Sequence, residues 1–274
     1  MFDMGLMYMK YTSKDVCKIY NINKETLRYY EKIGLIHPKV DKQNNYRYYD
    51  DWDFNAIGEC RKMRSLEISI KDTREIINNY ELYDFIKKIE EKQKDYENQI
   101  LYYKRLSDWN SEYIEQVKSI SDNLNKCKII EVEESYYIPY RKNFEYIFEK
   151  EIVMTMECIM ENYAFFQAAF YILKEDYESN NEIVFWGHSI KRKFSEYLNL
   201  ELPVKISFPK QKVIYSIIDA GERWNFNYHL FDYIKDYIRK KGYHQNGPIY
   251  GNILIRIHDN DKYCRYIEVF IPIE

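Results

Sequence analysis

The chain has 274 residues and a net charge of −3, and 46% of its residues are apolar, with aromatic residues alone making up 18%. This length exceeds one typical domain, and the apolar content can supply more than one core. No stretch approaches the length of a membrane-spanning helix and the first ten residues lack a signal-peptide pattern, which predicts a cytoplasmic protein with no membrane partner.

Two short helices separated by a turn are predicted near the N-terminus. Thr12 and Asp15 have the spacing of a capping box, and Asn23 is a natural N-cap before a helix over 24–32. This arrangement is typical of a helix-turn-helix, whose second helix enters the major groove of DNA. Helical periodicity places Arg28 and Tyr29 on the outward face of that helix.

A polar hairpin is predicted next, between an apolar run at 35–36 and the segment Arg47-Tyr48-Tyr49. Residues 10 to 49 carry nine basic and four acidic side chains, a local charge of +5 in an acidic chain. A local basic excess is expected where a protein neutralises phosphates. A solvated charged surface is the alternative interpretation of the same charges.

Several of these segments together resemble the DNA-binding domain of MerR-type regulators. The resemblance covers residues 11 to 77 and is carried by Thr26-Leu27-Arg28-Tyr29-Tyr30-Glu31, Ile33-Gly34-Leu35-Ile36, Asn45-Tyr46-Arg47-Tyr48-Tyr49 and Ile68-Ser69-Ile70-Lys71-Asp72. It implies that the hairpin is a wing and that a second helix pair, with helices over 53–65 and from Ser69 onward, forms another. One departure is Asn45, where the family usually has glycine; because asparagine tolerates the left-handed conformation, we expect the turn to survive.

By this resemblance, residues on the recognition helix, on the wing and on the helix over 53–65 contact DNA. The candidate DNA-binding residues are Lys24, Thr26, Arg28, Tyr29, Tyr46, Arg47 and Lys62.

A long helix is predicted between Tyr80 and Leu124, a segment without proline or glycine. Its heptad positions carry an incomplete apolar seam, so we expect an antiparallel coiled coil in a homodimer. A second apolar stripe begins at Leu106 and indicates where the helix meets another domain. This stripe comprises Leu106, Trp109, Tyr113, Val117, Ile120 and Leu124.

From Cys127 onward, short β-branched and aromatic runs alternate with helical segments, which predicts an α+β domain. Each half, divided near Pro203, suggests strand-helix-strand-strand. The expected strands cover 128–132, 213–218, 249–258 and 263–271, and the expected helices cover 151–174 and 224–241. The predicted fold is therefore multidomain, α and α+β: a winged helix-turn-helix over 1–79, a coiled-coil helix over 80–126 and a duplicated effector-binding domain over 127–274.

This last region resembles the GyrI-like effector-binding domain. The resemblance is carried by 221–241, Gly247-Pro248-Ile249-Tyr250 and the terminal Glu268-Val269-Phe270-Ile271-Pro272-Ile273. Combined with the N-terminal resemblance, it places the chain near the BmrR/TipA-like branch of the MerR family.

On the last predicted strand, the period of two places Glu268 between Tyr266 and Phe270 on one face. A carboxylate among aromatic rings suits a lipophilic cation. The alternative is an edge-strand glutamate in water. Where the GyrI-like family often has a glutamate after the tyrosine of Gly-Pro-x-Tyr, this chain has Gly251 and Asn252, so a neutral ligand also remains open. Further wall candidates, whose alternative is ordinary core packing, are Tyr250, Trp186 and Tyr140.

Neither a metal, a cofactor nor a catalytic residue is expected. The five cysteines are dispersed without Cys-x-x-Cys spacing, and none of His188, His229, His244 and His258 adjoins a recognisable nucleophile.

The two resemblances together imply a homodimeric, ligand-responsive transcription regulator rather than an enzyme. Its expected partners are promoter DNA, a second copy of the chain, a small-molecule effector and RNA polymerase, and it would bend and untwist an overlong promoter spacer when the effector is bound. In a bacterium this is a cytoplasmic protein that joins the nucleoid when bound to DNA. Two alternatives are a C-terminal domain that hydrolyses or sequesters a small molecule, with Glu268 as general base in the hydrolytic case, and one that binds a protein.

Overall fold

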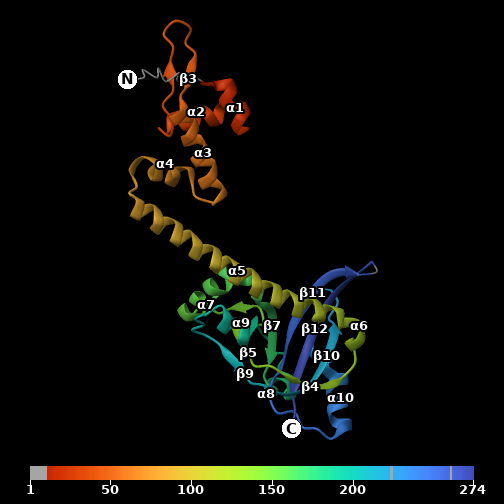
Figure 1. The fold of residues 1–274 in the computed structure, drawn as a ribbon. Helices are drawn as coiled ribbons and strands as arrows, with labels where there is room; N and C mark the ends of the chain where they lie inside the picture. The colour runs from red at the N-terminus through yellow and green to blue at the C-terminus, as the bar shows by residue number, and fades with distance from the viewer. Residues whose placement is uncertain (1–10, 223–224, 260) are drawn as a thin grey trace. The chain divides into compact units, whose positions relative to one another are not determined.

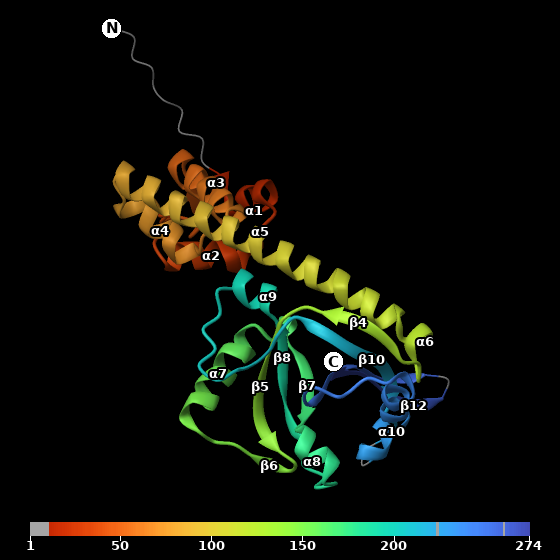
Figure 2. The same cartoon turned by 90° about the horizontal axis from the view of Figure 1, so that it is seen from below.

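The computed structural model describes residues 11–222, 225–259 and 261–274. The chain divides into two compact units, with the boundary between Ile100 and Leu101. The N-terminal unit is largely helical, and the C-terminal unit is built on one large antiparallel sheet (Figures 1 and 2).

The N-terminal unit begins with the predicted helix pair. Thr12 and Asp15 form the expected capping box, and the Asn23 side chain accepts a hydrogen bond from the Thr26 backbone N–H at 2.7 Å. These two caps start the helices because their side-chain oxygens satisfy backbone donors that have no partner within the first turn. The elements are β1 (Tyr11–Thr12), α1 (Ser13–Tyr20), α2 (Lys24–Lys32), β2 (Lys39–Val40), β3 (Arg47–Tyr49), α3 (Asp51–Ser65) and α4 (Ile70–Asn79).

The predicted hairpin is present, with β2 and β3 paired antiparallel and β1 on the other side of β3. Asn45 has a φ of 59°, as expected for the residue that replaces glycine at the tip. Its backbone N–H donates to the Asp41 carbonyl at 2.8 Å, and the Asp41 N–H donates to the Tyr46 carbonyl at 2.9 Å. Asparagine therefore supports the turn.

Helix α3 begins two residues earlier than predicted, because Asp50 and not a later residue is its N-cap. The Asp50 carboxylate accepts from the backbone N–H groups of Trp52 and Asp53, both at 3.1 Å. Ser69 caps α4 by accepting from the Asp72 N–H at 3.0 Å, as the sequence predicts.

The long helix α5 (Leu82–Lys118) is followed by a short helix, α6 (Ile120–Asn123). The second apolar stripe is confirmed. Leu106 and Trp109 pack with a core cluster of the C-terminal unit, and Ile120 and Leu124 pack with another. The Tyr113 hydroxyl donates to the Leu254 carbonyl at 2.7 Å, which fixes this part of the helix to the sheet.

The C-terminal sheet has nine strands, with the order β4-β10-β12-β11-β7-β8-β5-β6 and β9 paired to β5. Two strand-helix-strand-strand repeats, β5-α7-β7-β8 and β10-α10-β11-β12, meet at the β11–β7 pair, as the predicted duplication requires. The strands are β4 (Lys128–Val132), β5 (Ser135–Lys142), β6 (Glu145–Tyr146), β7 (Gln167–Ile172), β8 (Phe185–Lys191), β9 (Ile206–Phe208), β10 (Gln211–Asp219), β11 (Ile249–Asp259) and β12 (Lys262–Pro272). The α-helices are α7 (Lys150–Glu161), α8 (Lys174–Glu178), α9 (Arg192–Tyr197) and α10 (Asp232–Lys241).

Two helix predictions in this unit need correction. The helix expected over 151–174 ends at Glu161, and 167–172 is instead the central strand β7, because the apolar run there is buried between β8 and β11. A short apolar run gives no periodicity that separates a strand from a helix. The helix expected over 224–241 begins at Asp232, and its predicted first residue, Trp224, lies outside the described residues.

The two faces of the sheet have different roles. Along β12, Ile267 and Val269 pack with Ile234 and Ile238 of α10 in one core cluster. On the opposite face Phe270 packs in one cluster with aromatic residues of the neighbouring strands and with Ile120 and Leu124 of α6 and its C-cap. This second face carries the cavity described below.

Candidate functional site

The recognition helix α2 has the two faces that its sequence predicts. Leu27 and Tyr30 are buried in the core of the N-terminal unit, whereas Lys24 and Arg28 are exposed and the Tyr29 side chain is 47% exposed. Thr26 is partly buried beside the Asn23 cap. The outward side chains are therefore accessible without any rearrangement of the core.

The wing residues differ in their surroundings. Tyr46 is 62% exposed at the hairpin tip, whereas Arg47 is tied to α2 by a bond from its Nε to Glu31 Oε2 at 3.0 Å. The other oxygen of Glu31 accepts from the buried Tyr49 hydroxyl at 2.6 Å. Burial and, secondarily, Glu31 raise the pKa of that tyrosine. Glu31 thus joins the recognition helix to the wing.

In the sequence, Glu31 belongs to the motif that carries the family resemblance, and no role of its own is predicted for it. Nothing in the sequence pairs it with a residue sixteen positions later; the pairing follows from the way β3 lies against α2. On α3, Lys62 is exposed and its Nζ lies 3.7 Å from Glu59 Oε2 in a pair within one helix turn. Such an exposed pair contributes little stability and leaves the lysine available.

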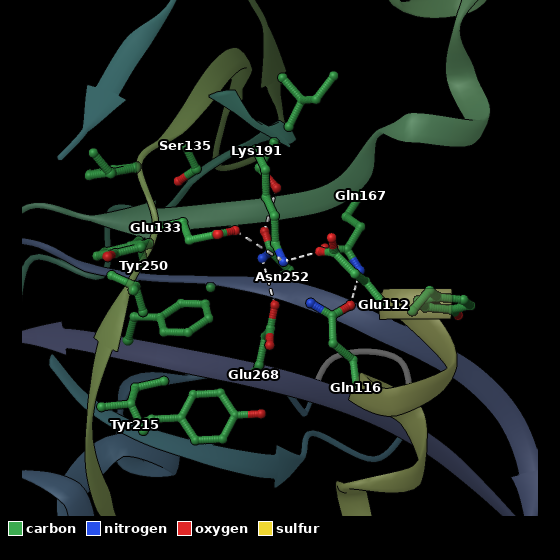
Figure 3. Close-up of a pocket in the computed structure, with 18 of the residues that line it drawn as sticks. Glu112, Gln116, Glu133, Ser135, Gln167, Lys191, Tyr215, Tyr250, Asn252 and Glu268 are labelled. Atoms are coloured by element: carbon green, nitrogen blue, oxygen red, sulfur yellow. Dashed lines mark hydrogen bonds and ion pairs between the residues drawn. The ribbon is translucent and has the colours of Figure 1, made fainter. Parts of the chain in front are cut away.

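In the C-terminal unit, a cavity of about 660 Å³ lies between the aromatic face of the sheet and the second half of α5 (Figure 3). Its floor comes from β10, β11 and β12 and its wall from α5, β4, β5 and β8. The residues of α5 that line it are Trp109, Ser111, Glu112, Tyr113, Glu115 and Gln116. The sheet residues that line it include Tyr137, Gln167, Ser189, Lys191, Phe208, Tyr215, Tyr250, Asn252, Glu268 and Phe270.

Glu268 is the buried acid of this cavity. Its side chain is 3% exposed, and its Oε1 accepts a hydrogen bond from Asn252 Nδ2 at 2.7 Å. Removal from water raises the pKa of the carboxyl to about 7, although the Asn252 bond and, more weakly, the charge of Lys191 act in the opposite direction. The solvent-exposed alternative for Glu268 is therefore wrong.

Aromatic rings form a stack beside this carboxyl. The rings of Phe208 and Tyr250 are parallel within 3° with centroids 4.2 Å apart, and Phe270 lies 5.2 Å from Tyr250. Tyr215 extends the series, 5.5 Å from Phe270. Figure 3 shows Tyr215 and Tyr250 flanking Glu268. A flat, apolar or cationic ring fits such walls.

Three of the six predicted effector residues, Glu268, Phe270 and Tyr250, line one cavity together. The other three lie elsewhere. Tyr266 shares their face and packs in the same cluster, but it is displaced two residues along the strand, or roughly 7 Å. Trp186 and Tyr140 lie on the opposite face. The ring centroid of Trp186 is 4.8 Å from that of Phe226, and the ring centroid of Tyr140 is 5.3 Å from that of His188.

Sequence reasoning missed a group of charged residues at the edge of the cavity. Lys191 and Lys193 both bond Glu112 of α5, with Nζ–oxygen distances of 2.5 and 2.6 Å. Lys193 also lies 3.0 Å from Glu133, and Lys191 lies 3.7 Å from the same carboxylate. Glu112 and Lys193 are 81 positions apart in the sequence, so no local pattern indicates the group.

Within the described part of the chain, no group of three His, Cys, Asp or Glu side chains is arranged as a metal site. Among the helices of residues 11–222, 225–259 and 261–274, none combines the length and apolar character needed to cross a bilayer.

Comparison with known proteins gives one family match. Residues 11–80 match the family described as MerR HTH family regulatory protein. The same region is 33% identical over 63 residues to the HTH-type transcriptional regulator HmrR of Sinorhizobium medicae (strain WSM419). It is 30% identical over 67 residues to the Multidrug-efflux transporter 2 regulator of Bacillus subtilis (strain 168). These alignments span 23% and 24% of this chain, and 43% and 24% of the two relatives.

Solved structures give looser similarities. The EcmrR chain in a cryo-EM structure of an EcmrR–DNA complex covers 96% of this chain and 99% of its own length at 16% identity, with a TM-score of 0.36. A hydrolase from Listeria innocua covers 58% of this chain and 98% of its own length at 9% identity, with a TM-score of 0.39. Superpositions this loose assign neither an activity nor a ligand.

Proposed function

Because residues 11–80 are a helix-turn-helix domain of the MerR family, we propose that this chain is a DNA-binding transcription regulator controlled by a small molecule in its C-terminal cavity. The single observation that carries the second half of this proposal is the buried Glu268 in an aromatic-walled cavity of about 660 Å³. A buried carboxyl that is not bonded to a cation lowers the stability of a fold. Such groups are found preferentially at functional sites.

The proposed DNA surface consists of the outward face of α2, the wing and the exposed basic residues of α3. Arg28 and Tyr29 lie where a recognition helix meets a groove, and Arg47 is held by Glu31 at the base of the wing. The relatives named above are transcription regulators, which is consistent with this assignment.

The proposed effector is a lipophilic aromatic molecule carrying one positive charge. Glu268 supplies the opposite charge, and the stacked rings of Phe208, Tyr250 and Phe270 supply apolar surface and negative ring faces. Activation of transcription, through distortion of a promoter that RNA polymerase then engages, belongs to the same proposal.

A homodimer formed through α5 is also proposed. Leu82, Ile86, Ile100 and Tyr103 follow the predicted heptad and are 76%, 46%, 69% and 65% exposed in the single chain. A row of exposed apolar side chains along one helix is typical of a coiled-coil surface. A molar mass of one chain by light scattering at micromolar concentration would contradict this.

Native mass spectrometry of freshly purified full-length protein, combined with DNA binding, tests the whole proposal. We expect a dimer that binds a specific DNA sequence selected from a random-sequence pool, and that changes transcription from a promoter carrying this sequence in vitro when a cationic aromatic ligand is added. Absence of any sequence-specific DNA binding at low salt would overturn the regulator assignment.

A hydrolytic C-terminal unit is the second candidate, and one observation favours it. A buried carboxyl with a pKa of about 7 is suited to general acid–base chemistry near neutral pH. Turnover of a chromogenic aromatic ester by the full chain, lost in Glu268→Gln, would support this candidate, whereas binding without turnover supports sensing.

A further inference from the structure

Glu268 is the end of a hydrogen-bonded chain that crosses the sheet. Asn252 of β11 lies directly opposite Glu268 of β12 in the strand register, and its Nδ2 donates to Glu268 Oε1. Ser189 of β8 in turn donates from its Oγ to Asn252 Oδ1 at 2.5 Å. Ala169 of the intervening strand β7 is paired with Asn252, and its small side chain leaves room for this bond to cross β7.

The hydrogen bonds place the donor end of the Asn252 amide against the carboxyl. An asparagine side chain has one donor end and one acceptor end. The Ser189 hydroxyl donates to the Asn252 oxygen, and the Asn252 NH₂ group donates to Glu268. An N–H donor on a carboxylate favours its ionised form, whereas an oxygen in the same place would oppose it.

We propose that Asn252 and Ser189 are positioning residues that favour the ionised form of the Glu268 carboxyl. The cavity therefore selects a singly charged aromatic cation over a neutral molecule of the same shape. This inference rests on the proposed effector function of the cavity. Asn252 lies on β11 and Ser189 on β8, and both residues act on the effector through Glu268.

The lysines that line the cavity contact groups other than the Glu268 carboxyl. Lys191, the cation whose field reaches Glu268, is bonded to Glu112 and lies near Glu133. Lys128 of β4 lies over the Tyr215 ring, with its Nζ 5.0 Å from the ring centroid. The ionisable residues that line the cavity are Glu112, Tyr113, Glu115, Lys128, Glu131, Glu133, Tyr137, Lys191, Tyr215, Tyr250 and Glu268.

Direct titration of the Glu268 carboxyl tests the inference without any ligand. The full chain is labelled with ¹³C at the glutamate side-chain carboxyl carbons, and the Glu268 signal is identified by its absence in Glu268→Gln. We expect Asn252→Leu to raise the titration midpoint by about one pH unit, and Ser189→Ala to raise it by less, because each removes support for the ionised form.

Asn181→Leu is the matched control for this titration. Asn181 also donates from its Nδ2 to a carboxylate, Asp176, at 3.1 Å, but it is exposed and lies outside the cavity lining. We expect this variant to leave the Glu268 midpoint where it is in the wild type. A Glu268 midpoint unchanged in Asn252→Leu would overturn the positioning role, and so would a downward shift.

Binding of two matched probes tests the selectivity. The cation 10-methylacridinium has no proton to lose between pH 7 and 9, and acridine at pH 8 is its neutral counterpart. We expect the wild type to bind the cation at least about tenfold more tightly, with the preference lost in Glu268→Gln. In Asn252→Leu the cation should bind about fivefold more weakly at pH 7 and recover at pH 9.

The outcomes separate the inference from the proposed function. Equal weakening of both probes at every pH in Asn252→Leu would indicate a packing role and overturn the inference alone. A wild type that binds acridine as tightly as 10-methylacridinium, or binds neither, would overturn both the selectivity and the proposed cationic effector.

Discussion

The proposed DNA surface and the C-terminal cavity are built in opposite ways. The former consists of exposed side chains on two helices and one hairpin, within about forty consecutive residues. The latter is lined by residues from Trp109 to Phe270, and its acid is 3% exposed. An exposed site is therefore governed by charge and salt, whereas a buried site is governed by desolvation and hence by pH.

The largest effect is expected at the buried acid. Glu268→Gln keeps the shape of the side chain but removes its charge, so binding of a cationic aromatic effector should fall about 100-fold. Isothermal titration calorimetry on the full chain measures this, and DNA affinity in the absence of effector should not change. If DNA affinity falls together with effector affinity, the two sites are not separable as proposed.

The same substitution should remove a loss of stability that the wild type undergoes as pH rises. Because the pKa of Glu268 is raised to about 7 from 4.5, the folded state binds this proton more tightly than the unfolded state. The free energy of unfolding therefore falls as pH rises from about 4.5 to 7 and stays lower above that range.

Glu268→Gln should accordingly be about 2–3 kcal/mol more stable than the wild type at pH 8, with the gain disappearing near pH 4.5. Urea unfolding at both pH values measures it. An equal difference at the two values would show that ionisation is not its cause.

A smaller effect is expected at the exposed surface. Arg28→Ala should weaken DNA binding about tenfold at low salt and reduce the salt dependence of binding by roughly one phosphate contact. Fluorescence anisotropy with labelled promoter DNA at several salt concentrations measures both. Arg239→Ala, an exposed arginine in a helix of the C-terminal unit, is the control. Wild-type affinity of Arg28→Ala at matched salt would make the recognition-helix assignment wrong.

The smallest effect is expected at Glu31, where a substitution tests whether the exposed surface also depends on a positioning residue. Glu31→Gln weakens the bond to Arg47 Nε and changes the partner of the Tyr49 hydroxyl. We expect DNA binding to fall about threefold through a displaced wing, in the range of about 0.2–1 kcal/mol that a partly exposed ion pair contributes. A gain in affinity would instead mean that the acid acts by repelling phosphate.

How much the sequence predicts differs between the two regions for a physical reason. The caps at Thr12 and Asn23, the helix over 24–32 and the left-handed Asn45 were predicted correctly because each depends on side chains within three or four residues. The alternation that places Glu268 and Phe270 on one face is equally local. Strand β7 was missed because its identity depends on two strands that pair with it from elsewhere in the chain.

Capping and periodicity in the sequence predicted the helix-turn-helix, the long helix and the face of the last strand that carries Glu268, since these signals act over a few residues. Only the tertiary structure decided that Asn252 and Ser189 meet that carboxyl, that Glu112 bonds two lysines and that Trp186 and Tyr140 lie away from the cavity. Burial of a group and its partners across strands depend on which segments the fold brings together.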